Sequence, residues 1–384
     1  MARFRRLQYH PFATAITLAS VLLIGTIAQA RIETIVVHAR SLEGNLLGDS
    51  ADRQVNVYLP PAYGESAAAR YPVLYLLHGY TGNHSLWTGQ GYFSGMDIDA
   101  VADDLIGSGV MPPLLIVMPN ADNAYWGSWY VNSEVTGNWE DFIVRELVDY
   151  VDGHYATLAQ RESRALAGHS MGGYGAAYLG IKYAETYSVL YPMSAAAIDM
   201  ETFILEVPVS GFPSGPTAFL TIANWDHFPG KSFTDWVAKA NVALAAAIAP
   251  APAEPRFLAD MPMVEEAGEA HVDEAVFERW MAADPLSMIA THTEDLRRYA
   301  AVRVDCGDAD DLIGQNRNFS AALTAAGIEH QFEDYPGNHT SNVAARMKSV
   351  VLPFIGTHLS SYPTVTTVES ASWGRIKIRH VGGM

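Results

Sequence analysis

Ser170 stands at the centre of a Gly-x-Ser-x-Gly pentapeptide, Gly168 to Gly172, a pattern in which a serine can act as a nucleophile. An apolar strand-like segment, 164–167, precedes the pentapeptide, and a helix-like run of small residues, 174–179, follows it. A nucleophile at so sharp a turn takes strained backbone angles, and its neighbours two positions away must be tiny for the turn to pack. The context therefore predicts a catalytic serine, with a glycine-rich turn that has no chemistry as the alternative.

Two loops further along the chain carry the partners that a serine nucleophile needs. A neutral alcohol attacks poorly, so a base must take its proton and a carboxylate must orient that base. In folds with this kind of turn, the acid and then the histidine follow the serine in chain order, each after a strand. His339 follows the strand-like segment 332–335 and is the predicted base, with a solvated loop histidine as the alternative. Asp308, Asp310 and Asp311 follow an earlier segment of the same kind, and the residues alone leave the choice among them open.

A third loop carries groups that would stabilise negative charge on a substrate. The sequence His78 to Gly82, of the type His-Gly-x-x-Gly, follows the apolar segment 73–77. Loops of this type supply a backbone N–H donor to an oxyanion, which is why they contain glycine instead of charged residues. We predict that the N–H groups of Tyr80 and Met171 form the oxyanion hole, with an ordinary turn as the alternative.

An aromatic loop follows another strand-like segment. Residues 120–133 contain several aromatic side chains, and aromatic residues on a loop after a parallel strand commonly line a substrate pocket. We predict that Trp126, Trp129 and Tyr130 contact the substrate, with packing beneath an insertion as the alternative. His169, next to the nucleophile, is expected to line the same pocket.

No pattern in the sequence indicates a metal or a cofactor. The chain has no His-Glu-x-x-His motif, no cysteine pair, and no glycine-rich loop typical of nucleotide binding. We therefore expect catalysis without metal and without cofactor. Cys306 is the only cysteine, so no internal disulfide can form, and its place in an apolar segment predicts a buried core residue.

Strand-like and helix-like segments alternate along most of the chain, which predicts an α/β fold with a mostly parallel central sheet flanked by helices. Residues 197–285 break the alternation with an alanine-rich stretch and a proline-rich hinge, and we expect an insertion that caps the carboxyl edge of the sheet. The catalytic domain should span 31–359, followed by a tail, 360–384, with no assigned role. The expected strands are 54–59, 73–77, 114–118, 164–167, 189–193, 302–305 and 332–335.

The first thirty residues have the features of a secretory signal peptide. Arginines precede an apolar run from about Ala13 to Ile27, and Ala28 to Ala30 offers the small-x-small pattern that signal peptidase cleaves after. The apolar run is short for a membrane span. We therefore expect cleavage after Ala30, a periplasmic or extracellular protein, and no stable insertion in a membrane.

The charge balance excludes one class of partner. The chain carries 24 Lys and Arg against 42 Asp and Glu, a formal net charge of −18. A surface this acidic repels phosphate backbones, so we expect no nucleic-acid partner. The charge does not identify the substrate.

Taken together, these motifs resemble the esterase D / putative esterase family, whose relatives include feruloyl esterases, S-formylglutathione hydrolases and bacterial mycolyltransferases. The resemblance runs from about Arg53 to Phe354, outside much of 197–280, and implies an α/β-hydrolase fold. It implies Asp310 as the triad acid, with Asp311 as the fallback, and it supports Tyr80 as an oxyanion donor. This chain departs from the family pattern in its longer insertion and its tail, so substrate identity does not carry over. The motifs that carry the resemblance are 75–79, 117–120, 128–130, 139–142 and 168–175.

The sequence therefore predicts a secreted serine carboxylic-ester hydrolase that acts through an acyl-enzyme on Ser170, with Asp310 and His339. An acyltransferase that delivers the acyl group to a sugar or another alcohol is the first alternative. A catalytically silent binding protein on the same scaffold is the second. The expected substrate is a small-molecule, carbohydrate or polymer ester, and the oligomeric state is not readable.

Overall fold

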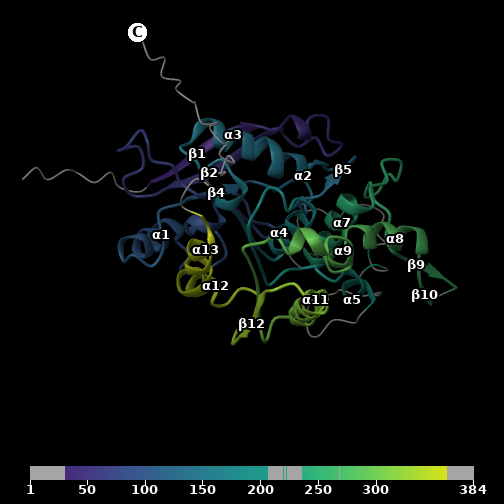
Figure 1. The fold of residues 1–384 in the computed structure, drawn as a ribbon. Coiled ribbons are helices and arrows are strands. Elements are labelled where there is room, and N and C mark those ends of the chain that lie inside the picture. The colour runs from purple at the N-terminus through teal and green to yellow at the C-terminus, as the bar shows by residue number, and fades with distance from the viewer. Residues whose placement is uncertain (1–30, 206–218, 220–221, 223–235, 268, 361–384) are drawn as a thin grey trace, which may run out of the picture.

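A computed structural model describes residues 31–205, 219, 222, 236–267 and 269–360 (Figure 1). The predicted signal peptide, 1–30, and the predicted tail after Ser360 lie outside the described residues. Part of the predicted insertion, 197–285, lies outside them as well. No helix within the described ranges is both long enough and apolar enough to cross a bilayer.

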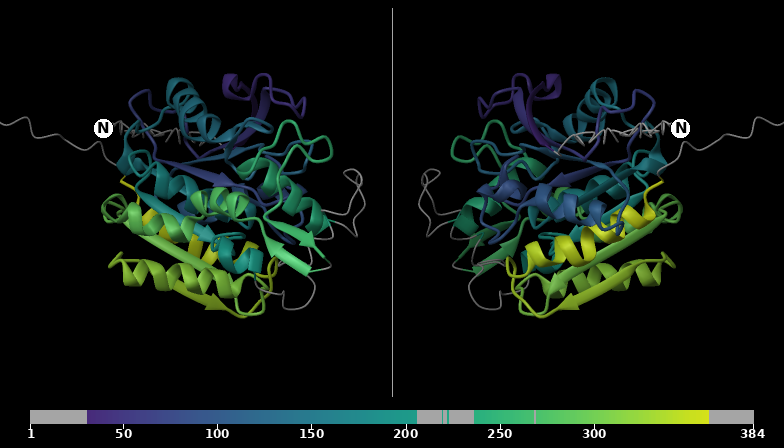
Figure 2. Two further views of the ribbon diagram at one scale, coloured as in Figure 1. Left: turned by 90° about the vertical axis from the view of Figure 1, so that its right-hand side faces the viewer. Right: turned by 90° about the vertical axis from the view of Figure 1, so that its left-hand side faces the viewer.

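The described chain builds one eight-stranded sheet in the order β1-β2-β4-β3-β7-β8-β11-β12. β2 pairs antiparallel with β1 and with β4, and every other neighbouring pair is parallel. Figure 2 shows β1 and β2 at one end of the sheet and β12 at the other. The mostly parallel sheet predicted from the sequence is confirmed. The strands are β1 Arg31–His38, β2 Asp52–Leu59, β3 Val73–Leu77, β4 Leu115–Pro119, β7 Arg164–His169, β8 Val189–Met193, β11 Ala301–Gly307 and β12 Gln331–Tyr335.

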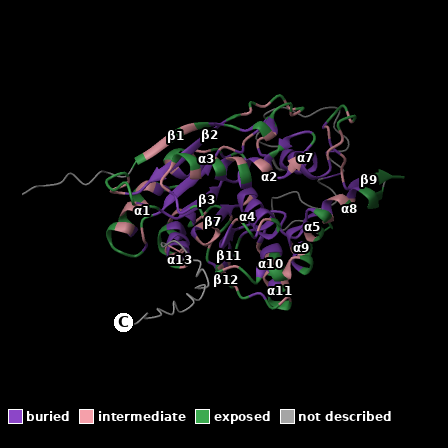
Figure 3. Ribbon diagram, turned by 45° about the horizontal axis from the view of Figure 1, so that its top comes forward, coloured by how far each residue is buried: buried purple, intermediate pink, exposed green. Residues whose placement is uncertain are grey.

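Central strands are apolar throughout because helices cover both faces of the sheet. In β3, every residue is buried: Val73, Tyr75 and Leu77 join one hydrophobic core, and Leu74 and Leu76 join the other. This alternation follows from the two-residue period of a strand. β12 lies at the sheet edge and is only partly buried, which fits its polar sequence. Figure 3 shows the buried residues concentrated on the central strands.

The two cores are closed by different helices. Apolar residues of α1, η6 and α13 join the core of Leu74, and those of η3, α3, α4 and α11 join the core of Val73. Figure 1 shows α1, α12 and α13 together and apart from α11. The helical segments are η1 Arg40–Leu42, η2 Leu86–Gln90, α1 Ile98–Gly107, α2 Trp139–Asp141, η3 Phe142–Glu146, α3 Leu147–His154, η4 Arg161–Ser163, α4 Met171–Lys182, α5 Met200–Leu205, α7 Trp236–Ile248, α8 Glu274–Ala282, α9 Pro285–Thr291, α10 Thr293–Leu296, α11 Ile313–Ala325, α12 Val343–Arg346, η6 Met347–Val351 and α13 Leu352–His358.

The described part of the insertion packs against the aromatic loop. The Ser133 hydroxyl, on β5 (Asn132–Ser133), donates to the carbonyl of Ala246 on α7 at 2.6 Å. The Tyr125 hydroxyl donates to the carbonyl of Phe257 at 3.0 Å. A hairpin, β9 (Met263–Glu266) and β10 (Glu269–Val272), projects beyond α8 (Figure 1). The insertion is thus bonded to the predicted pocket loop, and its role as a cap over the sheet edge stays a prediction.

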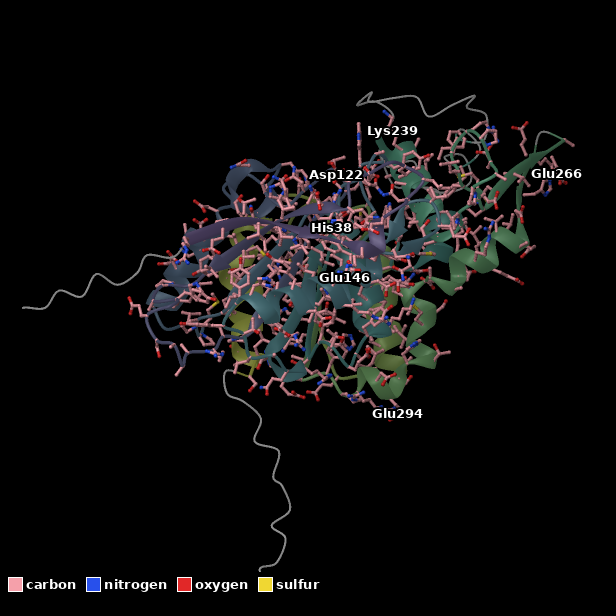
Figure 4. All side chains as sticks on the ribbon, turned by 90° about the horizontal axis from the view of Figure 1, so that it is seen from above. His38, Asp122, Glu146, Lys239, Glu266 and Glu294 are labelled. Atoms are coloured by element: carbon pink, nitrogen blue, oxygen red, sulfur yellow. The ribbon has the colours of Figure 1, made fainter. Side chains whose placement is uncertain are left out.

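Exposed carboxylates are spread over the molecule. Figure 4 shows Glu266 on β9 and Glu294 on α10 at separate edges of the molecule, and both are exposed. Lys239, by contrast, lies on α7 and is fully buried.

Candidate active site

Ser170 occupies a strained turn between β7 and α4. Its φ is 61° and its ψ is −118°, outside the regions that side-chain-bearing residues favour. A Cβ on Gly168 would lie 2.2 Å from the carbonyl oxygen of Gly172, and one on Gly172 would lie 2.4 Å from the carbonyl oxygen of Leu77. Side chains at these two positions would collide with backbone, so the pentapeptide needs glycine on both sides of the serine.

Three side chains that are far apart in the chain meet at this turn. His339 Nε2 lies 2.9 Å from Ser170 Oγ, and His339 Nδ1 lies 2.9 Å from Asp310 Oδ2. The Asp310 residue is 3% exposed. The structure therefore brings the predicted nucleophile, base and acid into one continuous chain of hydrogen bonds.

The Asp310 carboxyl stays ionised despite its burial. Burial acts to raise its pKa, but hydrogen bonds from His339 and from the Leu312 N–H, 3.0 Å from Oδ1, outweigh burial and hold the pKa below its ordinary value. An ionised carboxylate accepts the proton on His339 Nδ1. Nε2 is then free to accept the proton of the serine hydroxyl.

The two neighbouring carboxylates have other positions. Asp308 Oδ1 accepts the N–H of Gly337 at 3.0 Å and so braces the loop that carries His339. Asp311 is exposed, and partial burial together with the charge of Asp310 raises its pKa. His339 Nδ1 is bonded to Asp310, so the geometry favours this carboxylate among the three that the residues alone left open.

The side chains of Tyr80 and Met171, whose N–H groups are the predicted oxyanion donors, meet beside one glycine. A Cβ on Gly127 would lie 2.5 Å from Met171 Sδ and 2.8 Å from Tyr80 Cδ2, so both side chains meet over this glycine. Met171 begins α4, and the first N–H groups of a helix have no partner within it. The Tyr80 hydroxyl donates to the carbonyl of Tyr125 at 2.8 Å, which fastens this loop to the aromatic loop.

His78 braces the loop of Tyr80, a role that the sequence did not reveal. Its Nε2 accepts the N–H of Ala121 at 2.8 Å, so the ring proton is on Nδ1, which donates to the carbonyl of Gly79 at 2.8 Å. Burial lowers the pKa of His78 to about 4 and keeps the ring neutral. The His-Gly motif marked the position, but only the contacts show which atoms the ring joins.

Two aromatic residues predicted to contact substrate belong to the core. Tyr130 is fully buried, and its hydroxyl donates to the carbonyl of His78 at 2.8 Å. Trp129 is 3% exposed and packs edge-on against Tyr174, with ring centroids 5.7 Å apart. The structure contradicts the pocket prediction for these two rings, because side chains with almost no accessible surface cannot line an open pocket.

Trp126 is the aromatic residue for which substrate contact stays a prediction. It is half-buried, and its ring centroid lies 6.5 Å from that of Tyr80. The ammonium group of Lys239, on α7, lies 4.9 Å from the centre of the Trp126 ring. Trp126 therefore lies between the oxyanion loop and the insertion.

His169 does not line the pocket as predicted. It is 1% exposed, and its Nε2 lies 2.7 Å from the carbonyl oxygen of His339. Burial, and then the nearby His339, lower its pKa to about 3, so the ring is neutral. The ring contacts the backbone of the predicted base instead of open space.

Tyr92 lies close to the nucleophile and was missed from the sequence. A Cβ on Gly79 would lie 2.6 Å from the Tyr92 hydroxyl and 3.3 Å from Ser170 Cβ. Tyr92 is 43% exposed, so its ring reaches solvent while its hydroxyl faces the oxyanion loop. No motif surrounds Tyr92, and no sequence signal would have singled it out.

Cys306 lies on β11 with no exposed surface, as the sequence predicts. Its Sγ lies 3.5 Å from Asp310 Oδ2, and burial raises the pKa of the thiol, which stays protonated. Within the described ranges, no group of three or more His, Cys, Asp or Glu side chains could hold a metal ion.

The two buried neutral histidines should make stability depend on pH. An unfolded histidine has a pKa of about 6.5 and takes up a proton below that pH, whereas folded His78 and His169 resist protonation down to about 4 and about 3. We expect the free energy of unfolding to fall as pH drops from about 6.5 toward 4, by up to about 1.4 kcal/mol per pH unit for each ring. Urea titrations between pH 7 and 4.5 measure this slope.

The control separates these rings from the other titrating groups. His78→Gln and His169→Gln should each make the slope below pH 6.5 shallower than in the wild type, whatever they do to stability at pH 7. Identical slopes in wild type and both variants would contradict the assignment of buried neutral rings.

Comparison with known proteins identifies the family. Residues 50–343 match the family model described as putative esterase. The chain belongs to this esterase family. The resemblance inferred from the motifs is thereby confirmed.

Two curated relatives match only part of this chain. An esterase of Mycobacterium tuberculosis is 38% identical over 137 residues, which are 35% of this chain and 26% of that protein. An endo-1,4-beta-xylanase/feruloyl esterase of Xylanibacter ruminicola is 34% identical over 121 residues, 31% of this chain and 16% of that protein. The matches thus span about a quarter or less of the length of these two relatives.

Solved structures match almost the whole fold. A ferulic acid esterase is 23% identical with a TM-score of 0.58, and the match covers 86% of this chain and 99% of that one. An S-formylglutathione hydrolase from Staphylococcus aureus is 19% identical with a TM-score of 0.54, covering 87% of this chain and 100% of that one. These likenesses confirm the α/β-hydrolase fold.

Proposed function

We propose that this member of the esterase family is a serine carboxylic-ester hydrolase. The observation that carries the proposal is the unbroken series of hydrogen bonds from Ser170 through His339 to the buried Asp310. Membership of the esterase family supports the same reaction class. A silent binding protein on this scaffold has no need of a complete series, so the geometry favours an enzyme.

In the acylation half-reaction, Ser170 is the nucleophile, His339 is the base and then the acid, and Asp310 is the orienting carboxylate. Ser170 Oγ forms a bond to the ester carbonyl carbon while its proton passes to His339 Nε2. Asp310 stabilises the resulting imidazolium. The N–H groups of Tyr80 and Met171 hold the oxygen that becomes negative. When the intermediate collapses, the carbon–alkoxy bond breaks, the proton moves from Nε2 to the leaving alcohol, and an acyl-serine stays behind.

Deacylation repeats these steps with water. His339 Nε2 takes a proton from water as its oxygen attacks the acyl carbon, and the same N–H groups hold the second oxyanion. Collapse breaks the bond to Ser170 Oγ, which recovers its proton from the imidazolium. The products are one alcohol and one carboxylic acid, and the enzyme is unchanged.

The substrate class follows from the relatives only as a proposal. One curated relative is named a feruloyl esterase and another an acetyl esterase, so we propose carbohydrate-linked or small-molecule esters. The test gives the purified protein a series of p-nitrophenyl esters of increasing acyl length, beside methyl ferulate. We expect hydrolysis of at least one short-chain or aromatic ester, and no turnover of any of them would contradict the proposal.

Product analysis decides between hydrolysis and acyl transfer. The reaction is repeated with an added sugar or a simple alcohol, and both the free acid and the new ester are quantified. We expect free acid as the main product with and without the added acceptor. A new ester as the main product would replace hydrolase by acyltransferase.

We also propose that the protein is exported through residues 1–30. The charged start, the apolar run and the Ala28-Gln29-Ala30 end support this proposal. Expression of the full chain in a bacterial host, followed by fractionation and N-terminal sequencing, tests it. We expect a mature protein that begins at Arg31 outside the cytoplasm, and an uncleaved chain retained in the cytoplasm would contradict the proposal.

A further inference from the structure

His169 joins the two loops that carry the nucleophile and the base. It is the last residue of β7, directly before Ser170 in the chain. Its Nε2 lies 2.7 Å from the carbonyl oxygen of His339. A carbonyl oxygen only accepts, so Nε2 must carry the proton and donate it.

The hydrogen bonding and charge of the ring both fit this single contact. His169 Nδ1 is buried and has no hydrogen-bond partner among the described residues, so the bond to the carbonyl of His339 is the one that the ring makes there. Burial and the nearby His339 lower the pKa of His169 to about 3. A neutral ring adds no positive charge beside His339, whose ring centroid lies 4.7 Å away and which becomes cationic during the reaction.

Packing shields the His169 ring from water. The ring of Phe93 meets the His169 ring edge-on, with centroids 5.0 Å apart and an interplanar angle of 87°. Phe93 is itself 3% exposed. This packing excludes water from that side of the ring, and the bond to the carbonyl of His339 sets the direction of the N–H.

The loop that carries His339 has little regular structure of its own. Residues 336–342 lie between β12 and α12, and all of them are exposed or half-buried. Asp308 holds the loop at Gly337, and Ser341 Oγ accepts the N–H of Asn338 at 2.7 Å. His169 reaches the backbone of the base residue itself, from the residue next to the nucleophile.

We propose that His169 is a positioning residue that holds His339 at hydrogen-bond distance from Ser170. The proposal rests on the proposed serine esterase function and deepens it. One end of this hydrogen bond is adjacent to Ser170 in the chain and the other is on His339. The bond therefore holds the loops of the nucleophile and the base at a fixed distance from each other. Loss of the donor lets the imidazole drift from its 2.9 Å contact with the hydroxyl, and a displacement of about 1 Å costs on the order of 100-fold in rate.

The test compares variants that keep or remove the donor. H169L and H169F fill the space without a donor, and H169Q keeps an N–H group of similar reach. F93L is the matched control, because it disturbs packing against the same ring and leaves its donor in place. For each variant, kcat and KM with a p-nitrophenyl ester, the rate of fluorophosphonate labelling and the thermal midpoint are measured.

We expect H169L and H169F to lower kcat and the labelling rate about 100-fold, with KM within about threefold of the wild type. The kcat of H169Q should be about tenfold higher than that of H169L and H169F. F93L should lower the thermal midpoint and change kcat less than about threefold. Partial rescue by H169Q, together with an effect on kcat that F93L lacks, distinguishes positioning from general stabilisation.

Other outcomes would overturn the inference. A folded H169L or H169F variant with kcat within twofold of wild type would do so, as would equal losses of kcat in those variants and in F93L. If H169L and H169F both fail to fold, the test rests on H169Q. A folded H169Q protein that is no more active than the two misfolded variants would also contradict the inference. Wild-type hydrolysis that depends on Ser170 shows that the proposed function stands, whichever way the His169 variants behave.

Discussion

Ser170→Ala is expected to lower kcat/KM for p-nitrophenyl acetate by about 10⁶-fold. The alanine has no oxygen to form the acyl-enzyme, and the hydroxyl group that donates to His339 Nε2 is removed. Residual turnover then comes from the oxyanion donors and substrate binding alone. Steady-state kinetics measure the loss, and labelling with a fluorophosphonate probe should disappear with it.

The control for Ser170→Ala is the companion variant His339→Ala. Residues that act as one unit lose activity together, so the double variant should be about as inactive as either single variant. The Ser170→Ala protein should also keep a thermal midpoint close to wild type, because the change removes only one small hydroxyl group from a half-buried residue. Near wild-type turnover in a folded Ser170→Ala protein would rule out the serine mechanism.

Asp310→Asn is expected to lower kcat by about 10⁴-fold with little change in KM. The amide is neutral and can present its NH₂ group to His339, which favours the tautomer with the proton on Nε2. That tautomer cannot accept the proton of Ser170. The buried carboxylate makes hydrogen bonds with His339 and with the Leu312 N–H, and the variant removes its negative charge.

Asp311→Asn is the matched control for this acid. Asp311 is the adjacent residue, is exposed, and lies near His339, whose Nδ1 is bonded to Asp310. Asp311→Asn removes one negative charge, as Asp310→Asn does, from the next position in the chain. Its kcat should differ from the wild-type value by less than about threefold. A large loss in Asp311→Asn with a small loss in Asp310→Asn would transfer the role to Asp311.

The sheet and the positions of Ser170 and His339 were readable from the sequence because each depends on local signals. A strand buried on both faces must be apolar. The turn at Ser170 requires glycine at 168 and 172, where a Cβ would collide with nearby backbone. The chain order of serine, acid and histidine follows from the connections of such a sheet. Asp310 required the family resemblance, because three carboxylates share one loop.

The aromatic loop shows where this kind of reasoning fails. Trp126, Trp129 and Tyr130 have φ angles of 70°, 55° and 59°, in the left-handed region. Such backbone angles redirect side chains, and no two-residue or helical period predicts which way they point. Sequence therefore placed all three rings in the pocket, whereas the structure buries Trp129 and Tyr130.

Local sequence patterns indicate the chemistry that this chain can support: a serine at a strained turn, a histidine and an acid after later strands, and glycine where backbone must approach backbone. The contacts between atoms follow from the folded chain, as for the bond from His339 to Asp310, the brace made by His78, and the bond from His169 to the backbone of His339. The difference lies in the range of the interactions. Turn and strand preferences act between near neighbours in the chain, whereas a hydrogen bond between residues 170 positions apart depends on how the whole sheet packs.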